Sequence, residues 1–134
     1  MGITEGKIGR MNPYTRILVL DDDKGRHRAF QHALIGTIME HVYTAEEAIR
    51  MLESHPWDIF FCDHDLGDKV MVASGKGTGY EVAEWLRDNP HRMPKQIIVH
   101  SFNPVGAQNI KNVLPSAELV PGAWTLLRTG QMNQ

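Results

Sequence analysis

The sequence has one cysteine, no long apolar run and almost no net charge. A single cysteine cannot form an internal disulfide, which agrees with a reducing compartment. No unbroken apolar run exceeds four residues, whereas a membrane-spanning helix needs about twenty, so no membrane span is expected. Fourteen basic and sixteen acidic side chains leave a formal charge of −2, so no strong surface for nucleic acid or acidic lipid is indicated.

The chain has 134 residues, which is enough for one domain with a substantial core and too few for two. Residues 1–15 lack hydrophobic periodicity, contain three glycines and have no apolar stretch of the kind found in secretory signals. We therefore predict a flexible lead-in over residues 1–15, a folded domain over residues 16–128 and a short tail over residues 129–134. The expected location is the cytoplasm.

Short apolar runs alternate along the chain with helical patterns. The runs at Arg16–Leu20, Ile59–Cys62 and Gln96–Val99 are rich in branched and aromatic side chains and show no polar alternation. Such runs are typical of strands that are covered on both faces of a parallel sheet. Two further strands are predicted over His41–Tyr43 and Glu118–Val120. The β–α alternation predicts a doubly wound α/β fold with right-handed crossovers.

Residues that favour helix N-termini mark four helix starts: Asp23, Thr44, Thr78 and Asn103. Thr44 and Thr78 each precede a glutamate by three residues, which is the pattern of a capping box. A proline follows the last of these caps and occupies the first helical position, where its missing N–H is tolerated. The first helix is predicted over Lys24–Ile35, and a short last helix around Trp124–Leu127.

Five of the eight aspartates follow two predicted strands: Asp21, Asp22, Asp23, Asp63 and Asp65. Ligands of open α/β sheets bind beyond the carboxyl ends of the strands. If the two strands are neighbours, about 4.8 Å apart, their carboxylates converge and need a counter-charge. A hard divalent cation such as Mg²⁺, Mn²⁺ or Ca²⁺ would supply it through oxygen ligands. The alternative is that the acids are helix caps at a solvated edge, which is the role we expect for Asp23.

The fourth predicted strand is followed by His100, Ser101 and Asn103. A hydroxyl, an imidazole and the free N–H groups of a helix that starts at Asn103 would face the same edge, and helix N-termini favour phosphate. The alternative is that Asn103 only caps the helix and His100 packs in the core. Strict alternation along the strand places His100 on the opposite side from Ser101 and favours this alternative, whereas a twisted strand end would favour a functional role.

The segment 75–79 is rich in glycine but lacks the spacing of a phosphate-binding P-loop. We interpret Asp68–Gly77 as a mobile flap beside the acidic residues. Cys62 is interpreted as a buried small apolar side chain. The tryptophans, Trp124 among them, are interpreted as packing residues.

The run Leu18–Asp23, followed by Asp63 and then Ser101, resembles the receiver domain of two-component response regulators over about residues 16–127. In that family, the acids that match Asp21, Asp22 and Asp63 hold Mg²⁺. The aspartate that matches Asp63 accepts a phosphoryl group, and Ser101 matches the switch hydroxyl. The resemblance implies a flavodoxin-like, receiver-like sheet of five parallel strands in the order 2-1-3-4-5, with a short last helix and with Mg²⁺ or Mn²⁺ as cofactor.

The chain departs from ordinary receivers at the fifth strand, where Val120-Pro121 replaces a lysine followed by proline. Four further motifs resemble a divergent branch, the cyclic-phosphate processing receiver domain, which occurs as stand-alone proteins in bacteria and phages. These motifs lie in Asp22–Phe30, Asp63–Gly67, Gly77–Ala83 and His100–Gly106.

This resemblance implies metal-dependent binding and hydrolysis of a cyclic phosphate on a nucleotide or RNA end. The metal ligands would be Asp21, Asp22, Asp63 and Asp65. The catalytic candidates are Asp63, His64 and His100, since imidazole titrates near neutral pH. The side chains expected to bind phosphate are Arg26, Ser101 and Asn103. For Arg26, an ion pair with Asp22 one helical turn away is an equal alternative.

A second hypothesis is a signalling or protein-interaction module that is phosphorylated on Asp63 or docks a protein partner. The missing lysine argues against phosphorylation, and the retained acids argue against an inert scaffold. A phosphatase of the haloacid dehalogenase type ranks third, because only its opening motif, Asp21-x-Asp23, is present.

Overall fold

The computed structural model describes residues 11–128, so most of the predicted lead-in and the whole predicted tail lie outside the described residues. The described chain alternates strands with helices throughout. The elements are β1 Arg16–Leu20, α1 Lys24–Ala33, β2 Ile38–Val42, α2 Ala45–Ser54, β3 Ile59–Cys62, α3 Gly79–Asp88, a 3-10 turn at Pro90–Arg92, β4 Gln96–Val99, α4 Pro104–Val113, β5 Glu118–Leu119 and α5 Ala123–Arg128.

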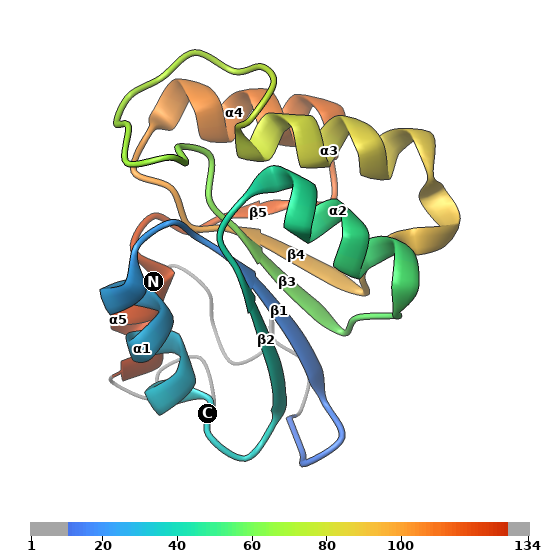
Figure 1. Ribbon diagram of the computed structural model, residues 1–134, viewed down its shortest axis with the longest axis vertical. Coiled ribbons are helices and arrows are strands. Elements are labelled where there is room, and N and C mark those ends of the chain that lie inside the picture. Colours follow the sequence, from blue (N-terminus) through green and yellow to red (C-terminus); the bar gives the residue numbers. More distant parts are fainter. Residues whose placement is uncertain (1–10, 129–134) are drawn as a thin grey trace.

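The five strands form one parallel sheet in the order β2-β1-β3-β4-β5. Helices α2, α3 and α4 cover one face, and α1 and α5 cover the other (Figure 1). The predicted doubly wound fold, its strand order and its short last helix are therefore confirmed. No helix within residues 11–128 is long and apolar enough to cross a membrane.

Each face of the sheet has its own apolar core. Leu18, Leu20 and Phe60 point toward α2, α3 and α4, whereas Val19 and Phe61 point toward α1 and α5. Alternate residues of the same strand thus supply both cores, which is why the strand sequences read as unbroken apolar runs. All five of these side chains are at most 1% exposed, and burying each of them stabilises the fold by about 1.5–3 kcal/mol.

The second strand is longer than predicted and begins at Ile38 instead of His41. It lies at the edge of the sheet, and its residues alternate between exposed and half-buried, with Glu40 facing solvent. Because the run at residues 38–42 contains charge and no continuous apolar stretch, it lacked the signal that marked the inner strands.

The predicted caps are present at all four helices, with one difference in detail. Thr44 and Glu47 form the reciprocal capping box. At α3, the Thr78 hydroxyl accepts from the backbone N–H of Tyr80, but the Glu81 carboxylate accepts from the N–H of Gly77 and not from that of Thr78. The box predicted there is wrong, because the backbone N–H of Thr78 already donates to the Gly75 carbonyl in a tight turn.

Candidate functional site

Three side chains from three neighbouring strands meet at the carboxyl edge of the sheet. Leu20, Cys62 and Val99 are cross-strand partners, so the residues that follow them, Asp21, Asp63 and His100, also lie side by side. Each offers one ligand atom, and these atoms lie within 4.8 Å of one another. All three side chains are buried. Parallel pairing in register therefore brings together three residues that are far apart in the sequence. Asp63 lies 42 positions and His100 lies 79 positions after Asp21.

Asp21 is fully buried between the side chains of Arg26 and His100. Arg26 binds both of its carboxylate oxygens, with 2.8 Å from Nε to Oδ2 and 2.8 Å from Nη2 to Oδ1. His100 Nε2 lies 2.8 Å from Oδ2. Burial alone would raise the pKa of Asp21, but the hydrogen bonds from His100 and Arg26 outweigh burial and hold the pKa well below its usual range.

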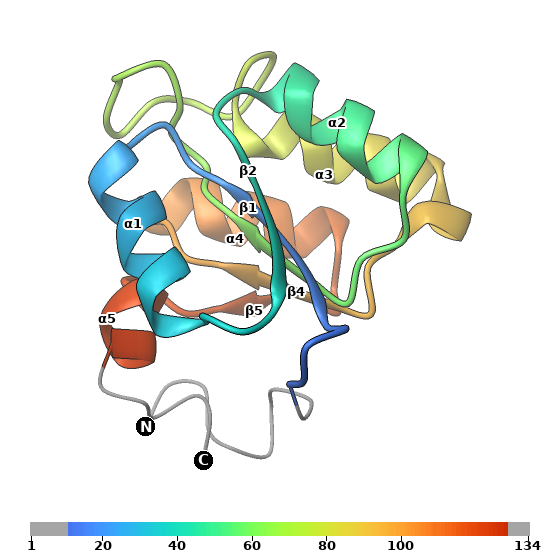
Figure 2. The ribbon, with the colours of Figure 1, turned by 60° about the horizontal axis from the view of Figure 1, so that its bottom comes forward.

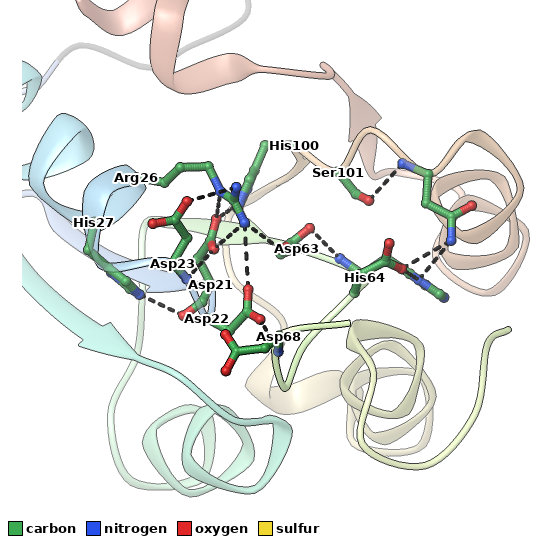
Figure 3. Close-up of polar contacts among 12 residues, drawn as sticks. Asp21, Asp22, Asp23, Arg26, His27, Asp63, His64, Asp68, His100 and Ser101 are labelled. Atoms are coloured by element: carbon green, nitrogen blue, oxygen red, sulfur yellow. Dashed lines mark hydrogen bonds and ion pairs between the residues drawn. The ribbon is translucent and has the colours of Figure 1, made fainter. Parts of the chain in front are cut away.

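Arg26 is the centre of the acidic cluster in Figure 3, where its guanidinium lies among four carboxylates. Besides the pair with Asp21, its nitrogens lie 3.0 Å from Asp23, 3.5 Å from Asp22 and 3.5 Å from Asp63. The ion pair with Asp22 that the sequence offered as an alternative is thus present, although it is longer than the bidentate contact with Asp21. The guanidinium therefore supplies one positive charge to the converging aspartates.

Asp63 has no such close cationic partner. One oxygen accepts from the backbone N–H of His64 at 2.8 Å, and the other lies at the longer distance from Arg26. Burial raises the pKa of Asp63 to about 6, which the nearby charges of His100 and Arg26 only partly oppose. A buried carboxylate in this state favours either a proton or an added cation.

Asp22 and Asp65 each contact the long loop at residues 67–78 between β3 and α3. Asp22 Oδ2 accepts from the backbone N–H of Asp68 at 2.6 Å, and Asp65 Oδ2 accepts from that of Met71 at 2.6 Å. Asp68 and Met71 both have positive φ, 62° and 54°, a conformation that is uncommon for non-glycine residues. The segment interpreted as a mobile flap is tied to the site by these bonds.

His64 is fully buried and both of its ring nitrogens are engaged. Nδ1 lies 2.6 Å from Asp65 Oδ1, and Nε2 lies 2.8 Å from the Ser74 hydroxyl. Gly106 of α4 faces the ring, and only glycine fits there, because a Cβ at this position would collide with the imidazole. His64 therefore joins the end of β3 to the loop and to α4, and it does not line the pocket described below.

Asn103 is both the cap of α4 and a link to the loop. Its Oδ1 accepts from the backbone N–H of Gly106, while its Nδ2 donates to Asp65 Oδ1 and to the Val72 carbonyl. The Ser101 hydroxyl accepts from the backbone N–H of Asn103 at 3.0 Å. Burial would raise the pKa of Asp65, but hydrogen bonds from His64 and Asn103 hold it below its ordinary value. Asp65 is thus satisfied within this network.

His100 lies on the side of the sheet that strict alternation predicted, beneath α1 and α5, and from there it also reaches the acidic cluster. Its Nε2 contacts Asp21, and its ring packs edge-on against Phe30 and Trp124, with centroids 5.1 and 5.6 Å away. Nδ1 is buried and has no hydrogen-bond partner among residues 11–128. The imidazole is therefore at once a packing residue beneath α1 and α5 and a partner of a site carboxylate.

A pocket of about 590 Å³ opens over the cluster. Its lining includes the acids Asp22, Asp23, Asp63 and Asp65, the cations Lys24, Arg26 and Lys69, and His100, Ser101 and Asn103. The loop at residues 67–78 arches over this edge of the sheet between α1 and α3 (Figures 1 and 2). The volume is within the range of small-molecule sites.

Two contributions were missed by sequence reasoning. Trp124 packs beneath Arg26, whose guanidinium lies 5.2 Å from the ring centroid, and no motif marks it. His27 is buried, and its Nε2 lies 2.7 Å from the Asp21 carbonyl oxygen, so it fixes the turn after β1. His27 and Arg26 are adjacent in a helix that the sequence did show to start among the aspartates, and that was the available signal.

Val120 is buried at the end of β5, where an ordinary receiver has its lysine. Arg26, from α1, is the cation that lies beside Asp63 in this chain. The positive charge near Asp63 thus comes from α1 and not from the end of β5.

These features define a receiver-type domain. It has a parallel five-stranded sheet with acidic side chains at the carboxyl edge (the acidic edge), where the buried aspartate directly after β3 is Asp63. The family model of the cyclic-phosphate processing receiver domain matches residues 16–116. The chain therefore belongs to that family, as the sequence motifs predicted. A comparison with curated proteins gives no match.

Solved structures of response-regulator receiver domains share the fold at low sequence identity. A signal receiver domain from a Luxo repressor protein of Vibrio parahaemolyticus has a TM-score of 0.66 at 18% identity, covering 87% of this chain and 86% of its own. The response regulator TrrA of Thermotoga maritima, in complex with Mg²⁺ and BeF, has a TM-score of 0.63 at 21% identity, covering 80% and 85%. A two-component response regulator of Clostridium difficile gives 0.62 at 20%, covering 90% and 99%.

The position of Arg26 leads to a first prediction. Arg26→Gln removes the guanidinium that binds both oxygens of the buried Asp21, so we expect the free energy of unfolding at pH 7, without divalent cations, to fall by about 1–3 kcal/mol. Because the guanidinium and a cation would neutralise the same carboxylates, added Mg²⁺ should recover most of the loss. Chemical denaturation with and without Mg²⁺ measures both effects.

Arg50→Gln is the matched control for this prediction, since Arg50 pairs with Glu46 on the exposed face of α2. Its effect should remain below about 0.5 kcal/mol with or without Mg²⁺. Equal stability of Arg26→Gln and Arg50→Gln would show that the guanidinium is not the internal counter-charge.

Proposed function

We propose that this protein binds and hydrolyses a cyclic phosphate ester, on a nucleotide or an RNA end, in a metal-dependent reaction at the acidic edge. The observation that carries the proposal is the alignment of Asp21, Asp63 and His100 on three adjacent strands beneath a pocket of about 590 Å³. Membership of the cyclic-phosphate processing family supports the substrate class.

The residues at this edge fit a hard divalent cation. Carboxylate oxygens are the ligands that Mg²⁺ and Mn²⁺ prefer, and Asp63 is a buried carboxylate without a close cationic partner. Asp21, Asp22 and Asp63 would hold the ion, and Asp65 would join them only by giving up its bonds to the loop. When bound, such an ion neutralises phosphate charge and lowers the pKa of water.

The chain's own groups supply the remaining steps. Arg26 and the N-terminus of α4 with Ser101 orient the non-bridging phosphate oxygens. A water oxygen then forms a bond to phosphorus, and one ring P–O bond breaks, leaving a phosphate monoester. We assign to Asp63 the role of accepting the proton that the water loses, and to His100 that of donating one to the departing oxygen. His64, with both nitrogens engaged, positions Asp65 and the loop.

The test is turnover of 2′,3′-cyclic and 3′,5′-cyclic nucleotides with Mg²⁺ or Mn²⁺, followed by phosphorus NMR. We expect a monoester product that depends on the cation, and a loss of at least about a hundredfold in kcat for His100→Gln. The matched control is His55→Gln, because His55 is exposed and remote from the acidic edge. Full activity of His100→Gln would make His100 a core histidine and remove it from the proton transfer.

A receiver-like signalling role is the second candidate, and the contact between Arg26 and Asp63 favours it, because a cation beside the central aspartate can stabilise a phosphoryl group. One solved relative, a response regulator of Burkholderia pseudomallei at 17% identity, carries a phosphorylated aspartic acid. Incubation with acetyl phosphate and mass spectrometry distinguishes the two functions. Stable labelling of Asp63 without turnover would establish the signalling role, with a protein as the partner.

A further inference from the structure

One aromatic side chain at the rim of the pocket is open to solvent. Phe102 follows Ser101 directly and is 60% exposed. It lines the same pocket as Asp63, Ser101 and Arg26. A large apolar ring at a polar site is costly to leave in water, since about 25 cal/mol is lost for each Å² of apolar surface that stays exposed. Its position therefore requires an explanation beyond packing.

The ring of Phe102 is held from beneath, not loosely attached. It packs edge-on against Trp124, with centroids 5.4 Å apart and planes at 80°. Gly122, with φ of +70°, lies so close that an added Cβ would be 3.0 Å from the ring Cζ. The ring is thus fixed by the turn that precedes α5, while more than half of its surface remains free.

Two more exposed apolar side chains line the same pocket. Val70 and Met71, on the loop at residues 67–78, are 82% and 62% exposed, and both line the pocket with Phe102. The bond from the Met71 N–H to Asp65 holds this part of the loop in place. The pocket therefore has a charged floor and an apolar rim with a rigid aromatic ring.

We propose that Phe102, with Val70 and Met71, forms a subsite for the base of a nucleoside cyclic phosphate. The inference rests on the proposed function and adds to it the residues that bind the base. Ser101 and Phe102 line the same pocket, so a phosphate bound at Ser101 would place the attached nucleoside beside Phe102. A fixed aromatic ring stacks on a base at little entropic cost, and stacking tolerates any base.

The experiment compares two ligands that share the cyclic phosphate: adenosine 2′,3′-cyclic phosphate and methyl riboside 2,3-cyclic phosphate, which has no base. Both are titrated calorimetrically with Mg²⁺, as phosphorothioates that hydrolyse slowly. We expect the wild type to bind the adenosine ligand about tenfold more tightly, and Phe102→Ala to lose this preference while keeping its affinity for the base-free ligand. Phe102→Tyr should restore the preference.

Tyr43→Ala is the matched control. Tyr43 is 37% exposed and lines a neighbouring pocket that shares Asp22 and Asp68 with the first. It should bind both ligands as the wild type does. The base-free ligand also reports folding, since a misfolded variant would lose it.

Each other outcome overturns the inference in a distinct way. Equal binding of the two ligands by the wild type would leave the proposed function standing and remove the subsite. A preference that survives in Phe102→Ala would assign the ring to another use, such as a protein contact, and loss in Tyr43→Ala alone would move the base to the other pocket. Failure of the wild type to bind either ligand would reject the proposed function and this inference with it.

Discussion

Asp63→Asn is expected to make the cation-free protein more stable at pH 7 and to abolish its response to Mg²⁺. The first effect follows from burial, which raises the pKa of Asp63 to about 6 and so opposes the charged carboxylate in the folded state. The neutral amide escapes this cost, and we expect a gain of about 1–3 kcal/mol in the free energy of unfolding. Thermal or denaturant unfolding in EDTA measures it.

The pH dependence of this gain has a definite sign. A carboxyl whose pKa is higher in the folded than in the unfolded protein makes the folded state bind more protons, so stability falls as pH rises from about 4 to about 6. The difference between Asp63→Asn and wild type should therefore be small at pH 4 and complete above pH 6. A constant difference across this range would show that Asp63 is not protonated preferentially in the fold.

The second effect follows from mass action. A cation that binds only the folded state at a hundred times its dissociation constant stabilises it by about 2.7 kcal/mol, and the variant should show none of this shift. Asp88→Asn, in an exposed pair with Arg87 at the end of α3, should respond to Mg²⁺ as the wild type does. An undiminished response in Asp63→Asn would remove Asp63 from the ion site.

Gly79→Ala is expected to have the largest effect on stability. Gly79 is the first residue of α3, and a Cβ there would overlap the backbone carbonyl oxygen of Asp63 and lie 3.1 Å from Cys62 Sγ. Neither β3 nor α3 is free to move, because the Gly79 N–H also donates to the His64 carbonyl at 2.9 Å. We expect a loss of at least about 3 kcal/mol together with a weaker response to Mg²⁺, since Asp63 must shift.

Gly75→Ala is the control for this variant, since nothing lies within 4 Å of a Cβ at Gly75 and its φ is not positive. It should change the free energy of unfolding by less than about 1 kcal/mol. If the two variants unfold at the same denaturant concentration, α3 does not approach the end of β3 as closely as described.

The inner strands could be predicted from the sequence because each is buried on both faces and reads as an apolar run. The runs at Arg16–Leu20, Ile59–Cys62 and Gln96–Val99 match the observed strands at both ends. The edge strand at Ile38–Val42 was found only in part, since two of its five residues are exposed and only Val42 is buried. Burial on both faces of the sheet, and not intrinsic propensity, decided which strand ends could be predicted.

The convergence of the acids was predictable from topology, but their partners were not. Strand ends that pair in parallel place Asp21 and Asp63 together whatever their side chains do. Side-chain rotamers determine which carboxylate oxygens contact Arg26. They also determine that Asp65 faces His64 and not the cluster of Asp21, Asp63 and His100, and sequence patterns do not encode rotamers. For His100, alternation predicted the correct side of the sheet, beneath α1 and α5, but not which carboxylate the imidazole contacts.

The bonds from Asp22 and Asp65 to the loop at residues 67–78 have a consequence for communication across the surface. In each of these residues one carboxylate oxygen accepts from a backbone N–H of the loop, and the side chain also lines the pocket. Any ligand that recruits that oxygen must release the loop, and release relieves two backbone conformations with positive φ. Binding at the floor of the pocket would then change the conformation of the loop, whose Val70 and Met71 side chains are exposed at the surface.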